Sequence, residues 1–119
     1  MKIEFEKTFG KGVDPWHDKA ERWVKKKFKN PFNLKIGIIV GKGNNGVDGI
    51  IAHYYLSQWN CSSKLILIDK TIKKSLIFSK YNISSDEIII YNKNINFIEF
   101  DLVIDGILGI GNSRKINSE

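Results

Sequence analysis

Residues 34–49 read Leu-Lys-Ile-Gly-Ile-Ile-Val and then Gly-Lys-Gly-Asn-Asn-Gly-Val-Asp-Gly. The first seven are mostly apolar and rich in β-branched residues, which is typical of a strand covered on both faces in a parallel sheet. The glycines after it let the backbone turn tightly and approach a ligand. A helix over Val47–Trp59 follows, and the N–H groups at its start suit an anion such as phosphate. The stretch therefore predicts a strand, a ligand-binding loop at Gly41–Gly49 and a helix.

The pattern outside this stretch alternates between helix and strand. Asp14-Pro15 is a typical helix start, and Asn30-Pro31 ends the helix. Strands separated by helices indicate a mainly parallel α/β sheet of the Rossmann type, with ligands at the carboxyl ends of the strands. The other expected elements are a strand at Lys64–Ile68, a basic helix at Thr71–Lys80 with Ile72, Leu76 and Phe78 inward, and strands at Glu87–Tyr91 and Leu102–Ile104.

A second loop with unusual residues follows the last expected strand. Asp105 ends that strand, and a carboxylate at the end of an apolar strand needs a partner, a cation or solvent. Glycines and polar or basic residues come next, from Gly106 to Lys115. Because both loops follow parallel strands, we expect them to meet at one edge of the sheet and form one site.

Composition excludes several classes of protein. The chain has 119 residues, which suits one domain, and its net charge of +6 is read as solvated lysine-rich helix faces, so nucleic-acid binding is not favoured. No apolar run is long enough to cross a membrane, and the one cysteine, Cys61, has no partner for an intrachain disulfide. These features favour the cytoplasm. Cys61 is not expected to act as a nucleophile, and His53 is expected on a helix surface.

Together the two loops resemble the NAD(P)H-hydrate epimerase family, whose domain is called the YjeF N-terminal domain. The family's Gly-Asn-Asn-Gly-Gly-Asp-Gly loop is matched by Gly43–Gly49, and its Asp-Ala-Leu-Phe-Gly-Thr-Gly segment is matched by Asp105–Gly111. The resemblance implies a three-layer Rossmann-like fold. It also implies an isomerase that interconverts the R and S forms of hydrated NADH or NADPH, with a bound potassium ion (K⁺), in nicotinamide-coenzyme repair.

The resemblance also implies roles for individual residues. Asn45 and Asp105 would bind the cation. Asp105 would stabilise the cationic intermediate or activate water. Lys70, which follows the expected strand at Lys64–Ile68, would serve as the acid. The residues implied to contact the hydrated dinucleotide are Asn44, Asn45, Gly46, Val47 and Asp48, with Gly109, Ile110, Gly111, Asn112, Ser113, Arg114 and Lys115 around its pyrophosphate.

Departures from the family pattern concern one residue and the length of the chain. Val47 replaces a glycine, which is costly if that position needs a positive φ. The family domain is longer, so residues 13–119 are expected to form a partial domain, incomplete at the C-terminal side, behind an N-terminal arm at 1–12. Four strands would leave an open sheet edge, for which we expect a homodimer or another partner. A non-catalytic nucleotide-binding or scaffold module is therefore the alternative to the epimerase.

Overall fold

The computed structural model describes residues 1–4, 16–28, 32–41, 44–74 and 76–106, and for residues 4, 16–21 and 44–48 it describes the backbone alone. The chain folds as an α/β domain with a five-stranded sheet in which every described pair of neighbours is parallel. The strand order is β1-β5-β2-β3-β4. The strands are β1 (Lys2–Glu4), β2 (Lys35–Val40), β3 (Ser62–Leu67), β4 (Ile88–Ile90) and β5 (Leu102–Asp105).

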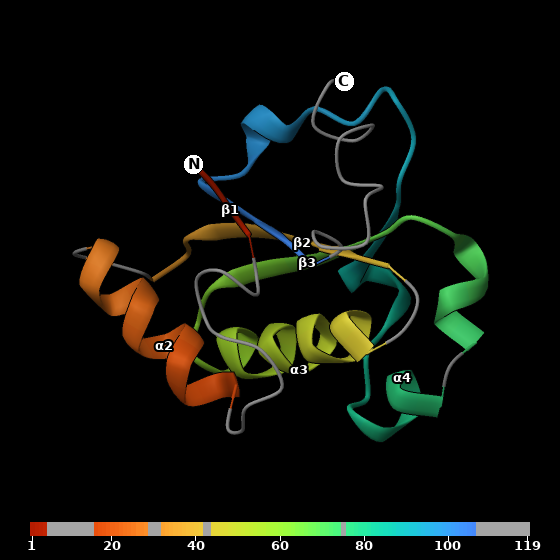
Figure 1. The fold of residues 1–119 in the computed structure, drawn as a ribbon, viewed down its shortest axis with the longest axis horizontal. Coiled ribbons are helices and arrows are strands. Elements are labelled where there is room, and N and C mark those ends of the chain that lie inside the picture. Colours follow the sequence, from red (N-terminus) through yellow and green to blue (C-terminus); the bar gives the residue numbers. More distant parts are fainter. Residues whose placement is uncertain (5–15, 29–31, 42–43, 75, 107–119) are drawn as a thin grey trace.

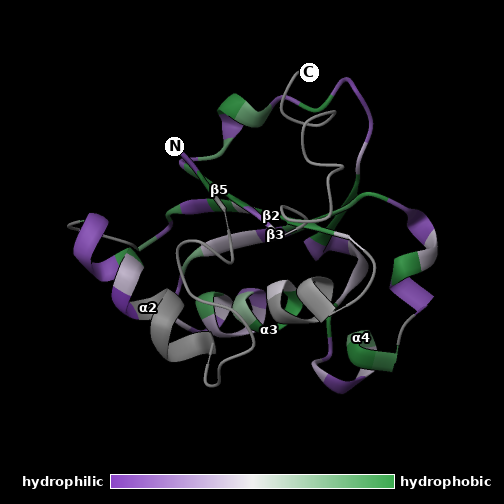
Figure 2. Ribbon diagram, in the orientation of Figure 1, coloured by the Kyte–Doolittle hydropathy of each residue, from purple (hydrophilic) through white to green (hydrophobic). Residues whose placement is uncertain are grey.

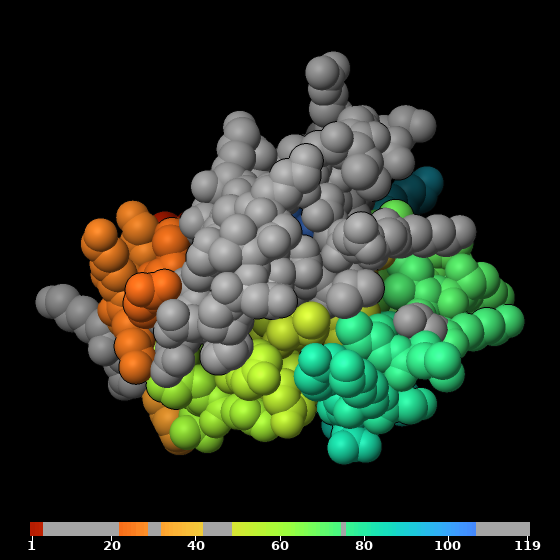
Figure 3. Space-filling model, turned by 60° about the horizontal axis from the view of Figure 1, so that its bottom comes forward, coloured from red at the N-terminus to blue at the C-terminus, as the bar shows by residue number. Residues whose placement is uncertain are grey.

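Helices cover one face of this sheet. Helices α2 (Trp16–Lys27) and α3 (Asn44–Gln58) lie side by side on it. The short α4 (Leu76–Lys80) lies beside α3 on the side away from α2 (Figure 1). The surfaces of α3 and α4 adjoin each other in the space-filling view (Figure 3). The opposite face carries the segment 91–100 with the 3₁₀ turn η3 (Phe97–Glu99). Two further 3₁₀ turns are η1 (Lys70–Lys74) and η2 (Ser85–Glu87).

The core is built from strand residues that alternate between the two faces. On the helix side, Ile36, Ile38 and Val40 of β2 join the buried residues of β3, β5 and α3. On the other side, Ile39, Ile66 and Val103 pack against the aromatic segment 91–100. In Figure 2 hydrophobic residues lie along much of the strands, and hydrophilic residues lie on the described part of α2 and on η1.

The three predicted central strands are confirmed. The expected runs at 34–40, 64–68 and 102–104 correspond to β2, β3 and β5, and the run at 87–91 contains the shorter β4. The predicted basic helix at 71–80 is instead η1 followed by α4. Phe78 is buried as expected, but Leu76 is 86% exposed, because two residues that are two positions apart lie on opposite sides of a helix.

A strand near the N-terminus was not expected. Lys2–Glu4, within the expected arm, form β1, which pairs with Val103–Asp105 of β5 (Figure 1). The Val103 N–H donates to the Met1 carbonyl at 2.8 Å. The expected number of four strands is therefore wrong, because β1 extends the sheet beyond β5 and becomes its edge strand. The expected homodimer or other partner at an open edge stays a prediction.

Candidate functional site

The carboxyl ends of β2, β3 and β5 lie at one edge of the sheet. The Gly106 N–H donates to the Ile39 carbonyl at 2.9 Å, and the Ile68 N–H donates to the Val40 carbonyl at 3.1 Å. Asp105 is the register partner of Ile39, and α3 begins four residues after the end of β2. The two sequence motifs therefore start from adjacent strands at the same edge, as the sequence predicted.

Asp105 is a fully buried carboxylate, with a relative exposure of 0%. It alternates along β5 with Ile104, which packs on the helix side, so it points to the face that carries segment 91–100. Its Oδ2 lies 3.9 Å from the ammonium nitrogen of Lys2 on β1. A buried charge needs compensation, and here the positively charged Lys2 side chain from the neighbouring strand lies next to the carboxylate.

Helix α3 begins earlier than the sequence suggested. It includes Asn44, Asn45 and Gly46, which were expected in a loop, because a helix start can accommodate asparagine near its first N–H groups. Val47 consequently has a helical backbone, which valine adopts without strain, so its substitution for glycine is compatible with the fold. Asp48 falls beyond the first turn of α3. A carboxylate there stabilises the helix less than one in the first turn, because its interaction with the helix dipole falls off with distance from the helix start.

Gly49 serves the packing of α3 on the sheet. A Cβ atom at this position would lie 3.2 Å from Ile38 Cγ2 and 3.5 Å from Val40 Cγ2. The helix start is thus held close to the end of β2, a use of glycine that also occurs where helices and strands meet at nucleotide sites. The absence of a side chain at Gly49, which was expected to let a ligand approach, instead lets α3 pack closely on β2.

Lys70 lies at the same edge as Asp105. It is the first residue of η1, directly beyond the end of β3, and it is exposed. The side chains of Asn44 to Asp48 are outside the described part, as are the predicted pyrophosphate contacts: Gly109, Ile110, Gly111, Asn112, Ser113, Arg114 and Lys115. Among the described residues, no three His, Cys, Asp or Glu side chains converge as a metal site.

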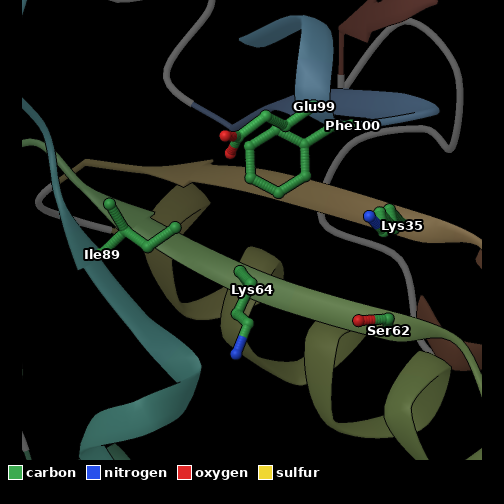
Figure 4. Close-up of a pocket in the computed structure, with 6 residues that line it drawn as sticks. All are labelled: Lys35, Ser62, Lys64, Ile89, Glu99 and Phe100. Atoms are coloured by element: carbon green, nitrogen blue, oxygen red, sulfur yellow. The ribbon is translucent and has the colours of Figure 1, made fainter. Parts of the chain in front are cut away.

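A pocket of about 380 Å³ lies on the face opposite α3. Lys35, Ser62 and Lys64 come from β2 and β3, and Glu99 and Phe100 come from the end of η3 (Figure 4). The pocket sits toward the amino ends of these strands, away from Asp105. It is therefore distinct from the predicted site.

The prediction of His53 on the helix surface is wrong. Its side chain is 0% exposed, and it lies between Ser63 of β3 and Glu87 of η2. The sequence held a signal for this position, because Ile50, His53 and Leu56 share one helix face and the other two are buried.

Cys61 is a buried thiol that forms no disulfide. Burial raises its pKa to about 11, so the thiolate is scarce near neutral pH. Because two pKa units correspond to about a hundredfold change in thiolate, we expect a disulfide reagent to react at least about 100-fold more slowly with the native chain than with the urea-unfolded chain. Stopped-flow absorbance checks this, and equal rates in the two states would contradict the burial of Cys61.

No helix in the described part of the chain is long and apolar enough to cross a membrane. The family model described as YjeF-related protein N-terminus matches residues 18–119. This match spans most of the chain and includes both motifs. The chain belongs to the YjeF N-terminal domain family.

One curated relative is similar over most of this chain. The bifunctional NAD(P)H-hydrate repair enzyme Nnr of Dictyoglomus turgidum (strain DSM 6724 / Z-1310) is 31% identical over 102 residues, which are 82% of this chain and 20% of the relative. The chain thus spans about a fifth of the length of that protein. No solved structure matches significantly.

Proposed function

We propose that this chain acts on hydrated NADH or NADPH as an epimerase, interconverting the R and S forms at the hydroxyl-bearing carbon of the reduced ring. The observation that carries the proposal is the buried Asp105 at the same sheet edge as the start of α3 and the exposed Lys70. Family membership and the repair enzyme as a relative support the substrate class.

The proposed chemistry needs one proton donor and one group that accepts a proton. The hydroxyl leaves as water after it receives a proton, and the ring nitrogen supplies electrons to leave an iminium carbon. Water then adds to the other face of that carbon and loses a proton. Lys70, exposed beyond β3, is the proposed donor, and Asp105 is the proposed group that stabilises the positive carbon and accepts the proton.

The burial of Asp105 suits both parts of this role. A carboxylate held away from water interacts more strongly with a developing positive charge than one in solvent does. It lies at the carboxyl end of β5, and ligands bind beyond the carboxyl ends of the strands in open α/β sheets. The N–H groups at the start of α3 lie at the same edge and suit the pyrophosphate of the substrate.

Potassium belongs to the proposal, with Asn45 and Asp105 as its ligands. A buried carboxylate oxygen such as that of Asp105 is a ligand type that hard cations take, and this supports the proposal. The ion would share the Asp105 charge with the Lys2 ammonium, whose nitrogen lies 3.9 Å from Oδ2. When bound, the ion would supply fixed positive charge for the phosphates and for the loop at the start of α3. We expect potassium to raise the affinity for the dinucleotide, as measured by calorimetry in potassium and in a large organic cation.

The test is coenzyme recovery. R-hydrated NADH is incubated with the purified chain and with a dehydratase specific for the S form, and absorbance of NADH is followed. Recovery faster than spontaneous epimerisation is expected. Binding of the hydrated dinucleotide without acceleration would contradict the epimerase and favour the non-catalytic nucleotide-binding module.

A further inference from the structure

The buried cluster on the helix side of the sheet joins three elements through one imidazole ring. His53 Nδ1 lies 2.7 Å from Ser63 Oγ, and His53 Nε2 lies 2.8 Å from Glu87 Oε1. Both His53 and Ser63 are buried, and Glu87 is partly buried. The ring therefore links α3 to β3 and, through η2, to the start of the edge strand β4.

The partners fix the tautomer of the ring. An ionised carboxylate only accepts hydrogen bonds, so Nε2 carries the hydrogen and donates it to Glu87. Nδ1 is then the acceptor, and the Ser63 hydroxyl donates to it. A second proton on the ring would go to Nδ1, and the Ser63 hydroxyl would then rotate to accept from it, because a hydroxyl both donates and accepts. What opposes the second proton is therefore the burial of the ring, which is 0% exposed, since burial disfavours the charged form.

The charges around the ring come from several elements. Glu87 of η2 faces Nε2, and the Lys64 ammonium of β3, which donates to the Asp86 carbonyl at 2.6 Å, also acts on the ring. Beside α4, Tyr81 packs on Tyr54, the residue next to His53. Burial lowers the pKa of His53, and Lys64 adds to this, while Glu87 opposes it. The net result is a pKa below the ordinary 6.5.

The Glu87 end of the cluster is held by a capping box. The Ser84 N–H and hydroxyl both donate to Glu87 Oε2, at 2.8 and 2.9 Å. Burial alone would raise the pKa of Glu87, but these bonds and the one from His53 outweigh it and lower the pKa. Glu87 therefore stays ionised over the range in which a histidine titrates.

We infer that His53, Ser63 and Glu87 form a proton-sensitive clamp that fastens η2 and β4 to α3 and β3, and that acid loosens the β4 edge of the sheet. The clamp does not depend on the proposed epimerase, because none of its residues lies at the end of the sheet that carries Asp105. The clamp responds to the binding of a proton.

The direction of the pH effect follows from the lowered pKa of His53. The unfolded chain binds a proton near the ordinary value of 6.5, whereas the folded chain resists it until a lower pH. The stabilisation is therefore complete above the ordinary pKa and is lost as pH falls toward the folded-state value. Glu87 gives a further loss of stability below its own ordinary pKa of 4.5, as pH falls toward its lowered folded-state value.

Nuclear magnetic resonance of the intact 119-residue chain tests the clamp directly. The chain has two histidines, so His17→Gln assigns the His53 signal. We expect His53 to be the Nε2–H tautomer near neutral pH and to titrate below 6.5. Titration at or above 6.5, or the Nδ1–H tautomer, would overturn the inference.

One variant tests the contact with the carboxylate. Glu87→Gln removes the negative charge that favours the charged ring, so it should lower the pKa of His53 further. An unchanged or raised pKa of His53 in Glu87→Gln would refute this contact.

Amide hydrogen exchange tests the loosening of the edge. Corrected for intrinsic rates, the opening of Ile88–Tyr91 should increase by up to about tenfold for each pH unit below the ordinary histidine pKa. His53→Gln should flatten this dependence, and the amides of β2 serve as the internal control. If His53→Gln does not fold, the wild-type profile still decides, because β4 opening that tracks β2 opening would exclude a local clamp.

Discussion

Replacing Asp105 with asparagine should reduce epimerisation by about 10²- to 10⁴-fold, the range typical of a lost acid–base group, while leaving the chain folded. Asparagine has nearly the same shape as aspartate, so the buried space at the end of β5 stays filled. It carries no negative charge and does not accept a proton from water. The rate of recovery of NADH from the R hydrate, with the S-specific dehydratase in excess, measures the loss.

The stability of the same variant separates chemistry from folding. Removing the negative charge leaves Lys2 without its neighbour, but that side chain is 38% exposed and water can solvate it. We therefore expect the free energy of unfolding to stay within about 1 kcal/mol of the parent or to rise, since a buried charge is costly. A variant that loses activity only because it unfolds would not support the proposed role.

Asp101→Asn is the matched control. Asp101 lies just before the start of β5, at the opposite end of that strand, and is exposed. Its Oδ2 accepts a hydrogen bond from the Lys35 N–H at 2.9 Å, a bond that an asparagine oxygen also accepts. Epimerisation should be unchanged. Equal losses in Asp101→Asn and Asp105→Asn would argue against a site at the carboxyl edge.

Replacing Ile38 with alanine should destabilise the chain by about 2–5 kcal/mol, as for other large-to-small changes in a well-packed core. Ile38 is 0% exposed, and its register partners on the two neighbouring strands are Leu65 and Ile104. It also lies directly beneath Gly49 of α3. The deleted atoms leave a cavity that three strands and a helix border, and such a site does not collapse easily.

Urea denaturation measures this effect. The transition midpoint should fall with little change in the slope, because the surface exposed on unfolding is almost the same. Ile98→Ala removes the same atoms from a side chain that is 90% exposed, and its effect should stay within about 0.5 kcal/mol. A loss below about 1 kcal/mol for Ile38→Ala would contradict the packing described around β2.

Sequence reasoning identified the central sheet because the signals there are local. The β-branched runs that became β2, β3 and β5 are apolar on both faces, and that pattern follows from burial by helices on one side and by aromatic residues on the other. The shared edge of the two motifs followed from parallel topology alone. The roles assigned to the site residues stay predictions.

The misses share a physical cause, which is contact with distant parts of the chain. Nothing in the three residues Lys-Ile-Glu marks a strand, because β1 is specified by pairing with residues about a hundred positions later. His53 was read as a surface residue because its two partners come from β3 and η2. Whether a polar residue of a helix is buried depends on the residues that face it in the fold, and local helix propensity carries no information about those residues.

The pairing of β1 with β5 has a consequence for how the chain is made. The Met1 ammonium and the Asp101 carbonyl lie 3.3 Å apart although 100 positions separate them in sequence. A nascent chain exposes its first residues long before their partners leave the ribosome, and closing so long a loop is slow. Strand β1 must therefore stay unpaired until β5 has been synthesised, and its two charged residues, Lys2 and Glu4, favour its staying in solution until then.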